Sequence, residues 1–176
     1  MLGFDCSEEL SNDKYEFFEK MLSKGIPPIS SSIDFLHHLA QEKHKYEIKL
    51  AVASGARKKE ILTNLRNLGI ESYFDVIISG HDDLNEYEDL DGTNKPKPYI
   101  YLKAAKLLCV SPENCMAIED SYAGLTSAVT AGCITIAIPN EYTQYHDLSS
   151  ADIKLESFIG LSFKDILNKL STNSEE

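Results

Sequence analysis

The sequence lacks any apolar run close to the roughly 20 residues that a membrane-spanning helix needs. Its start, MLGFDCSEEL, lacks the basic region and following apolar stretch of a signal peptide. Positive charge is also scarce, because 17 Lys and Arg stand against 28 Asp and Glu, a net charge of -11. That field repels nucleic acid phosphates and anionic membranes. We therefore expect a cytoplasmic protein without nucleic acid or membrane partners.

Metal-binding cysteine patterns are also missing. The four cysteines form no C-x-x-C pair, and no histidine stands at zinc-finger spacing, so reduced thiols are the favoured interpretation. There is no internal repeat, and the only low-complexity stretch is the polar end STNSEE, which predicts a disordered tail over 171–176. A length of 176 residues with 43% hydrophobic residues suits one compact domain.

Apolar runs alternate with helical patterns from residue 46 onward. This alternation is typical of a parallel sheet wrapped by helices and predicts an α/β fold. The expected strands cover 46–53, 73–79, 115–119 and 133–139, with a short one within 151–157, and the expected helices cover 57–69, 98–109, 121–132 and 162–170. The first 45 residues differ, since they predict two helices joined by the stiff segment IPPI and no strand before them.

Polar residues follow several of the predicted strands, where parallel sheets bind their ligands. Ser54 and Gly55 follow the first strand and precede a helix, so a hydroxyl and unpaired amides would face an anion there. The alternative is that Ser54 is a helix cap. Lys95 ends the polar loop after the second strand, and the prolines of KPKP fix its direction, which suits phosphate, although Lys97 could serve as well.

Glu119 and Asp120 close the third predicted strand. Adjacent carboxylates at such a point suit Mg²⁺, which binds one or two carboxylates and keeps several waters. The alternative is that Asp120 caps the following helix. The order serine, lysine, acid pair, each at a strand end, is that of a phosphoryl and metal site. A phosphoacceptor signalling domain would have its acid pair first, so the order argues against that class.

Three segments resemble the second, third and fourth motifs of the haloacid dehalogenase superfamily, in its β-phosphoglucomutase-like subgroup: AVASGARKKEI, NKPKPYIYLKAAKLL and CMAIEDSYAGLTSAVTAGCITIAIPN. The resemblance implies a three-layer Rossmann-like parallel sheet. It also implies phosphate binding by Ser54 and Gly55, charge neutralisation by Lys95, and a Mg²⁺ cofactor held by Glu119 and Asp120. By the same resemblance, 1–30 would be a partial helical cap with its return segment and 31–170 the α/β core.

The resemblance also makes one element missing. In this family a nucleophilic aspartate and an acid-base aspartate end the first strand, before the cap, and this sequence begins within the cap. That strand would lie between the strand ending at Ala53 and the one ending at Glu119. We therefore expect a gap about one strand wide, or a sheet that closes and repacks. A second copy of the chain, through self-association, or a complementing N-terminal segment would then be the protein partner.

Two other places offer aspartates. Asp89 to Thr93 spell D-x-D-G-T, but no apolar strand delivers them, so we expect an acidic turn bent at Asp91-Gly92. Asp5 has too few residues before it for a strand and no second aspartate two places on. Neither is expected to be the nucleophile.

Two hypotheses follow. The first is a phosphatase or phosphomutase for a small phosphorylated metabolite of the phosphosugar type, inactive or incomplete as this chain because both aspartates are absent. The alternative is a non-catalytic phosphate- and Mg²⁺-binding or interaction module derived from such a hydrolase. Tyr99 stands where the family often has an acidic residue, which weakens any substrate assignment.

Overall fold

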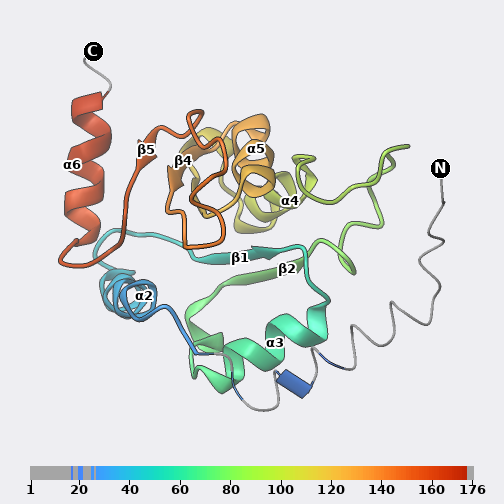
Figure 1. Ribbon diagram of the computed structural model, residues 1–176, viewed down its shortest axis with the longest axis horizontal. Helices are drawn as coiled ribbons and strands as arrows, with labels where there is room; N and C mark the ends of the chain where they lie inside the picture. Colours follow the sequence, from blue (N-terminus) through green and yellow to red (C-terminus); the bar gives the residue numbers. More distant parts are fainter. Residues whose placement is uncertain (1–16, 18–19, 22–24, 26, 174–176) are drawn as a thin grey trace.

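The computed structural model describes residues 17, 20–21, 25 and 27–173. Helices and strands alternate along the described chain, so the predicted α/β class is confirmed (Figure 1). The strands are β1 (Ala51–Ser54), β2 (Val76–Ser79), β3 (Met116–Glu119), β4 (Ile134–Ala137) and β5 (Ile153–Lys154). The helices are α2 (Ser30–Glu42), α3 (Lys58–Asn67), α4 (Tyr99–Leu108), α5 (Tyr122–Ala131) and α6 (Phe163–Asn173).

The described strands form two parallel sheets rather than one. In the first, β1 pairs with β2, and Ser54 stands opposite Ser79. In the second, β3, β4 and β5 pair in that order. No strand pairing joins β1 to β3 within the described part of the chain. The break lies between the two strands where the family resemblance implies an absent one, and we refer to this boundary between β1 and β3 as the seam.

Helices cover both faces of the sheets and give the predicted three-layer architecture. On one face, α4 packs on the first sheet and α5 on the second, and one apolar cluster that includes Ile100 of α4, Ile78 of β2 and Ala117 of β3 joins them. On the other face, α3 packs on the first sheet and α6 on the second. The core therefore lies in two layers, one on each side of the strands.

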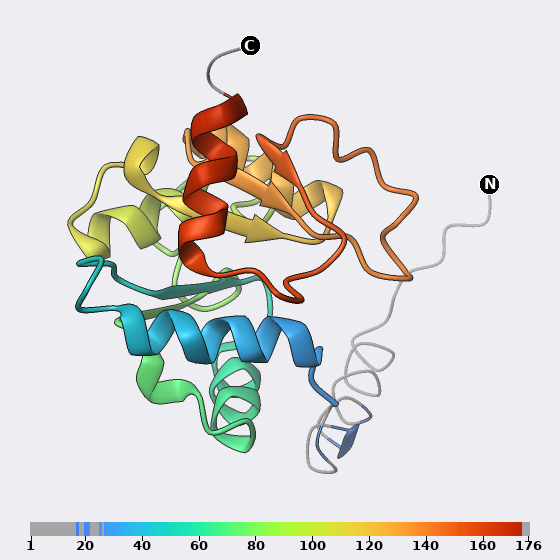
Figure 2. The same cartoon turned by 90° about the vertical axis from the view of Figure 1, so that its left-hand side faces the viewer.

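Helix α2 reaches across the seam on the face opposite α4. Its Phe35 belongs to the cluster of β4, β5 and α6 and stacks on Phe158, with ring centroids 4.1 Å apart. Its Ile33 and Leu36 pack instead with α3 and with Val52 of β1. Figure 2 shows α2 running beside β1, with β3 and β4 beyond it. Helix α2 and the apolar cluster of α4 and α5 thus hold the separate sheets relative to each other.

Two strands begin later than the sequence predicted. Residues 46–50 precede β1, and Glu47 turns the chain with a φ of 52°. The segment predicted as a strand over 73–79 starts within a 3₁₀ turn, Glu71–Tyr73, and only Val76–Ser79 is a strand. The apolar runs begin before the regular pairing in both cases, because local turns determine where the strand starts.

The helix ends follow local capping chemistry. The Ser121 hydroxyl accepts a hydrogen bond from the Gly124 amide at 3.2 Å and so caps α5. The alternative that Asp120 caps this helix is therefore wrong. Helix α5 ends at Gly132, whose φ of 86° suits glycine. Helix α6 continues through Asn173, three residues into the predicted tail.

Several predictions fall outside the described residues. They include Asp5, most of the partial cap over 1–30, and residues 174–176 of the tail. Within the described chain, none of the helices combines the length and apolar character needed to cross a membrane.

Candidate functional site

Two consecutive loop residues, Asn94 and Lys95, connect the carboxyl ends of the two sheets. The Asn94 side chain lies over Gly55 and Gly80, the residues that follow β1 and β2, and a Cβ on Gly80 would collide with it. The Lys95 ammonium forms an ion pair with Glu119, the last residue of β3. Ser54-Gly55, Lys95 and Glu119 therefore gather at one edge, over the end of the seam.

The Lys95 ammonium lies in a largely buried polar cluster. The side chains of Lys95 and Glu119 are only 17% and 9% exposed. The Tyr101 hydroxyl donates to the same Glu119 oxygen, and Lys95 Nζ lies 3.4 Å from that hydroxyl. Burial, followed by the Glu119 carboxylate, raises the pKa of Tyr101, so its hydroxyl keeps its proton and remains a donor. Glu119 thus accepts from two donors at once.

Gly124 in the first turns of α5 makes room for the Glu119 carboxylate. A Cβ on Gly124 would overlap the carboxylate and come within 2.8 Å of its second oxygen. The carboxylate cannot give way freely, because Lys95 and Tyr101 hold it from the other side. The glycine is therefore needed for close approach rather than for an unusual backbone angle.

Ser54 and Gly55 lie where the sequence placed them, at the carboxyl end of β1. The Ser54 hydroxyl accepts a 3.3 Å hydrogen bond from the Ala56 amide, but the N-cap of α3 is Arg57. The alternative that Ser54 is a helix cap is therefore wrong. Gly55 is exposed, and its N-H has no hydrogen-bond partner among the described residues. This amide can still bind an anion.

The amides at the amino end of α3 were predicted to be unpaired and to face a bound anion, but one of them already has a partner within the chain. The Lys58 amide donates to the Asp82 carboxylate at 2.6 Å. This bond, with a further one from His81, lowers the pKa of Asp82. Lys58 Nζ also pairs with Asp83 at 2.7 Å. The acidic loop after β2 therefore supplies the anion at this helix end.

Glu119 and Asp120 are adjacent but point to different partners. Whereas Glu119 faces Lys95, the exposed Asp120 accepts a hydrogen bond from the side-chain Nδ2 of Asn140 at 2.8 Å. No group of three His, Cys, Asp or Glu side chains within the described ranges is arranged to hold a metal. Asp120 fits Mg²⁺ as a carboxylate ligand at a wet edge, where water would complete the shell. Glu119 is committed to Lys95 in this arrangement.

The D-x-D-G-T stretch is a turn, as predicted. The Asp89 carboxylate accepts bonds from the Asp91 amide, Tyr99 Oη and Lys97 Nζ at 3.0, 3.0 and 3.1 Å. The Gly92 amide donates back to the Asp89 carbonyl, closing the bend. Because Lys97 is held in this loop, Lys95 is the lysine that faces the carboxyl end of β3.

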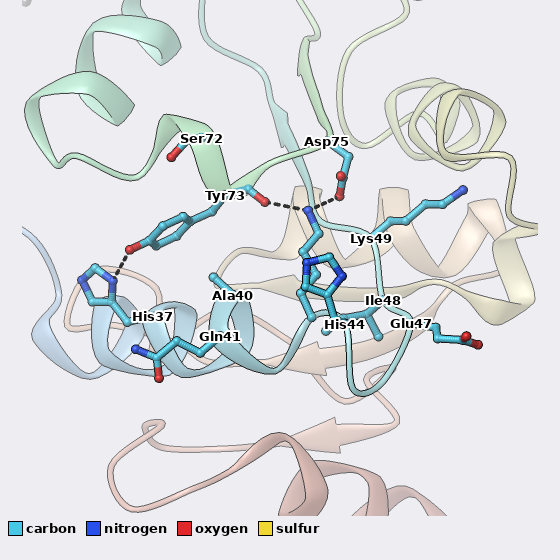
Figure 3. Close-up of a pocket in the computed structure, with 11 residues that line it drawn as sticks. His37, Ala40, Gln41, His44, Glu47, Ile48, Lys49, Ser72, Tyr73 and Asp75 are labelled. Carbon is cyan, nitrogen blue, oxygen red and sulfur yellow. Dashed lines mark hydrogen bonds and ion pairs between the residues drawn. The ribbon is translucent and has the colours of Figure 1, made fainter.

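A separate open cleft of about 670 Å³ lies near the amino ends of β1 and β2 (Figure 3). His37 Nδ1 and the Tyr73 hydroxyl are 2.7 Å apart there, and Lys43 pairs with Asp75 at 2.6 Å. Figure 3 shows His37 and Tyr73 side by side along one wall. Ligands of parallel sheets bind at the opposite, carboxyl end, so this cleft is not the predicted site.

Three residues of the site, Asn140, Asn94 and Tyr101, were not predicted from the sequence. Asn140 directly follows the fourth predicted strand, and looking for polar residues after every strand would have found it. Asn94 precedes Lys95, but its role depends on the glycines beneath it. Tyr101 belongs to the apolar face of α4, and no pattern marked its hydroxyl as part of the site.

Residues 5–138 match the family model for haloacid dehalogenase-like hydrolases. The chain belongs to this family. Its relatives include the Bacillus subtilis protein YhcW, 30% identical over 169 residues, which cover 95% of this chain and 70% of YhcW. The "Phosphorylated carbohydrates phosphatase" of Thermotoga maritima is 31% identical over 150 residues, 85% of this chain and 60% of that protein. The chain is thus shorter than both.

Solved structures agree with this haloacid dehalogenase-like assignment. The β-phosphoglucomutase of Clostridium difficile superposes on this chain with a TM-score of 0.73, over 99% of this chain and 71% of the mutase. The two sequences are 24% identical, so this likeness supports the fold. CbbY of Rhodobacter sphaeroides, solved with phosphate, matches 88% of the chain and 65% of its own, with 29% identity and a TM-score of 0.69. The β-phosphoglucomutase-like subgroup is supported by the structure of a "putative beta-phosphoglucomutase from Thermotoga maritima", which is 26% identical, covers 80% of this chain and 59% of its own, and has a TM-score of 0.59.

Proposed function

We propose that this chain forms the phosphate-binding part of a Mg²⁺-dependent phosphatase or phosphomutase for a small phosphorylated metabolite. The observation that supports this best is the position of the loop residues Asn94 and Lys95. They place the shielded Lys95 ammonium at the carboxyl ends of the strands, where Gly55 has a free N-H and Asp120 an exposed carboxylate. Phosphoryl transfer depends mainly on such positioning and charge neutralisation.

Each residue has a distinct role in this proposal. Lys95 neutralises phosphoryl charge, while the Gly55 amide and Ser54 hydroxyl bind phosphate oxygens. Asp120 would hold Mg²⁺, which when bound neutralises further phosphate charge. Glu119 holds Lys95 in place through the ion pair and the Tyr101 bond.

A nucleophile must come from elsewhere. Among the described residues, no strand ends in D-x-D, and Asp89 and Asp91 belong to a turn tied to Lys97. We infer that the nucleophilic aspartate is carried by a strand outside the described residues, and that the 176-residue chain alone turns over little or no substrate.

The relatives support a phosphosugar-type substrate. The Thermotoga maritima relative is named for phosphorylated carbohydrates, and a mutant of CbbY was also solved with xylulose-(1,5)bisphosphate. A cytoplasmic location would suit such a metabolite.

Activity assays test this function. The chain is purified with and without a co-expressed segment whose apolar strand ends in D-x-D, then assayed with Mg²⁺ on p-nitrophenyl phosphate and sugar phosphates. Hydrolysis that requires the segment and disappears in Lys95→Met supports the proposal. A folded complex without hydrolysis of any of these substrates overturns it.

A second candidate is a non-catalytic phosphate- and Mg²⁺-binding module. The ion pair of Lys95 with Glu119 favours it, because the pair leaves less net positive charge to stabilise a transferred phosphoryl group. It predicts weak Mg²⁺ or phosphate binding that Asp120→Asn reduces, with no hydrolysis of p-nitrophenyl phosphate. Turnover by the purified chain would exclude this candidate.

A further inference from the structure

Cys115 and Cys133 stand side by side at the amino ends of two paired strands. In the register of the second sheet, Met116 of β3 lies opposite Ile134 of β4, so the residue before each strand is a cysteine. The Ile134 amide donates to the Cys115 carbonyl at 2.9 Å, which extends the pairing to these two residues. Neighbouring strands lie about 4.8 Å apart, so the Cα atoms of the two cysteines are separated by roughly that distance.

Both cysteine side chains lie on the same face of the sheet. Because side chains alternate along a strand, Cys115 points to the same side as Ala117, while Met116 points to the other. Ala117 and Cys133 belong to the apolar cluster of α4 and α5, Cys115 packs against it, and Met116 packs against the cluster of α6. Two thiols therefore project side by side from neighbouring strands, and neither forms a disulfide.

Backbone hydrogen bonds hold each cysteine in place. The Cys115 amide donates to the Pro112 carbonyl at 2.9 Å, and the Cys133 amide donates to the Ala128 carbonyl at 3.1 Å. The Cys115 thiol also lies 3.5 Å from the Ser111 carbonyl oxygen. Cys133 is only 8% exposed, whereas Cys115 is partly buried and can be reached from solvent. The pair is thus preorganised and open on one side.

The spacing of the pair suits a metal ion between the sulfurs better than a bond between them. A disulfide needs Cβ atoms roughly 3.5–4.5 Å apart, which is closer than the strand spacing of about 4.8 Å. Two side chains in the same rotamer keep their sulfurs about as far apart as the strands. A metal–thiolate bond is about 2.3 Å long for zinc, so one ion midway between the sulfurs reaches both of them.

The number and type of ligands select the class of metal. Structural zinc takes four ligands, whereas no His, Cys, Asp or Glu side chains within the described ranges form a group of three that could hold an ion. Calcium and magnesium prefer oxygen ligands. Soft thiolates select Cu(I), which is stable with two ligands in line.

We propose that Cys115 and Cys133 form a two-coordinate site for one soft, monovalent metal ion of the Cu(I) class. Binding replaces two S-H bonds with two metal–sulfur bonds. Both thiol protons are released to solvent, and the resulting complex carries one net negative charge beside the partly exposed Cys115.

Burial of the thiols affects how the site is filled. Burial raises the pKa of the Cys115 thiol, and burial, followed by the nearby Cys115, raises the pKa of Cys133 to about 11. Both thiols are therefore protonated at neutral pH, which slows their oxidation, because the thiolate is the reactive form. A coordinating metal instead deprotonates a thiol outright. The affinity for the metal must then depend on pH.

Anaerobic titration with Cu(I), in competition with a coloured Cu(I) chelator, tests the site. The full 176-residue chain carries Cys6→Ser and Cys109→Ser, so that only the pair remains. One Cu(I) should bind per chain and should protect both thiols from alkylation by iodoacetamide. Because two protons leave, the affinity, corrected for the chelator, should rise about 100-fold per pH unit near neutral pH.

Single replacements provide matched controls, with folding checked by circular dichroism. Adding Cys115→Ser or Cys133→Ala should weaken Cu(I) binding roughly 100-fold or more, because the second sulfur no longer acts at a high effective concentration. Restoring Cys109, which is exposed at the end of α4, should not recover the affinity of either variant.

Three results would overturn the proposal. The first is Cu(I) binding that is unchanged in folded Cys115→Ser and Cys133→Ala variants. The second is one Cu(I) per two chains, with a dimer in size-exclusion chromatography, which would mean that the sulfurs come from different copies. The third is no Cu(I) binding; a disulfide formed with hydrogen peroxide, which releases two water molecules, would then make the pair a redox site. These measurements need no turnover, so they are independent of whether the chain is a phosphatase.

Discussion

Lys95 and Glu119 form an ion pair that closes the carboxyl end of the seam, although 24 residues separate them in the sequence. Both side chains are shielded from water, and Tyr101 adds a second donor to the carboxylate. Removing one partner of a shielded pair leaves an uncompensated charge, which costs far more than breaking an exposed pair. The pair therefore serves both the stability of this edge and the charge of the site.

Replacing Lys95 should weaken folding as well as phosphate binding. Lys95→Met leaves Glu119 without its cation and should lower the free energy of unfolding by about 2–4 kcal/mol, measured by urea denaturation. Lys97→Met is the control, since its partners Asp89 and Asp91 lie in the loop, and should change stability by about 1 kcal/mol or less. Equal effects of the two variants would contradict the shielded pair.

Gly124→Ala should disturb the Lys95 site from a position without any polar side chain. Alanine is normally the better helix residue by about 1 kcal/mol. Here its Cβ would displace the Glu119 carboxylate, so the variant should be destabilised and should bind phosphate less well. Ala123→Gly, in the same turn, is the control for helix propensity alone. A stabilised Gly124→Ala variant with unchanged phosphate binding would exclude this role.

The acidic loop should contribute a pH-dependent part of stability through Asp83. Burial alone would raise the pKa of Asp83, but bonds from Lys58 and the Ser79 amide hold it below its usual value. A carboxylate whose pKa is lower in the folded state stabilises the fold. This contribution is fully present above the unfolded-state pKa of about 3.9, and it is lost as the pH falls through the lower folded-state pKa.

The measurement compares Asp83→Asn with the wild type by urea denaturation. At pH 7 the variant should be less stable by about 1–3 kcal/mol, and the difference should shrink below about pH 4. Glu88→Gln, an exposed change in the same loop, should show no such dependence. A constant difference from about pH 7 to about pH 3 would contradict the assignment.

The D-x-D-G-T turn should be dispensable for chemistry. Replacing both Asp89 and Asp91 with Asn should leave phosphate binding, and any phosphatase activity of the complemented protein, within about twofold, because neither carboxylate reaches Lys95 in the structure. A modest loss of stability is expected from the lost Lys97 and Tyr99 contacts. A variant that folds normally but loses activity would show that Asp89 or Asp91 takes part in catalysis.

The sequence was informative where chemistry and position coincide. Apolar runs ending in polar residues correctly located Ser54 and Glu119 at the ends of β1 and β3, because the strand and the site residue adjoin in the chain. The alternation of runs also predicted the α/β layers, and the family resemblance located the break between β1 and β3.

Contacts between segments that are distant in the chain could not be predicted from the sequence. The occupation of the α3 amino end by Asp82 depends on how the acidic loop folds back, and the Tyr101 bond depends on the orientation of α4. Likewise, nothing in the string Glu119-Asp120 showed that one carboxylate would face Lys95 and the other Asn140. That divergence follows from the alternation of side chains along an extended segment and from the loop after β4.

The most direct test of the account is an NMR titration of the 176-residue chain with inorganic phosphate in the presence of Mg²⁺. The account predicts that the largest amide shifts occur at Gly55, Lys95 and Asp120, that Lys95→Met abolishes them, and that Lys97→Met retains them. Shifts centred instead on His37 and Tyr73 in the cleft at the amino ends of the strands, or no saturable shifts at all, would contradict it.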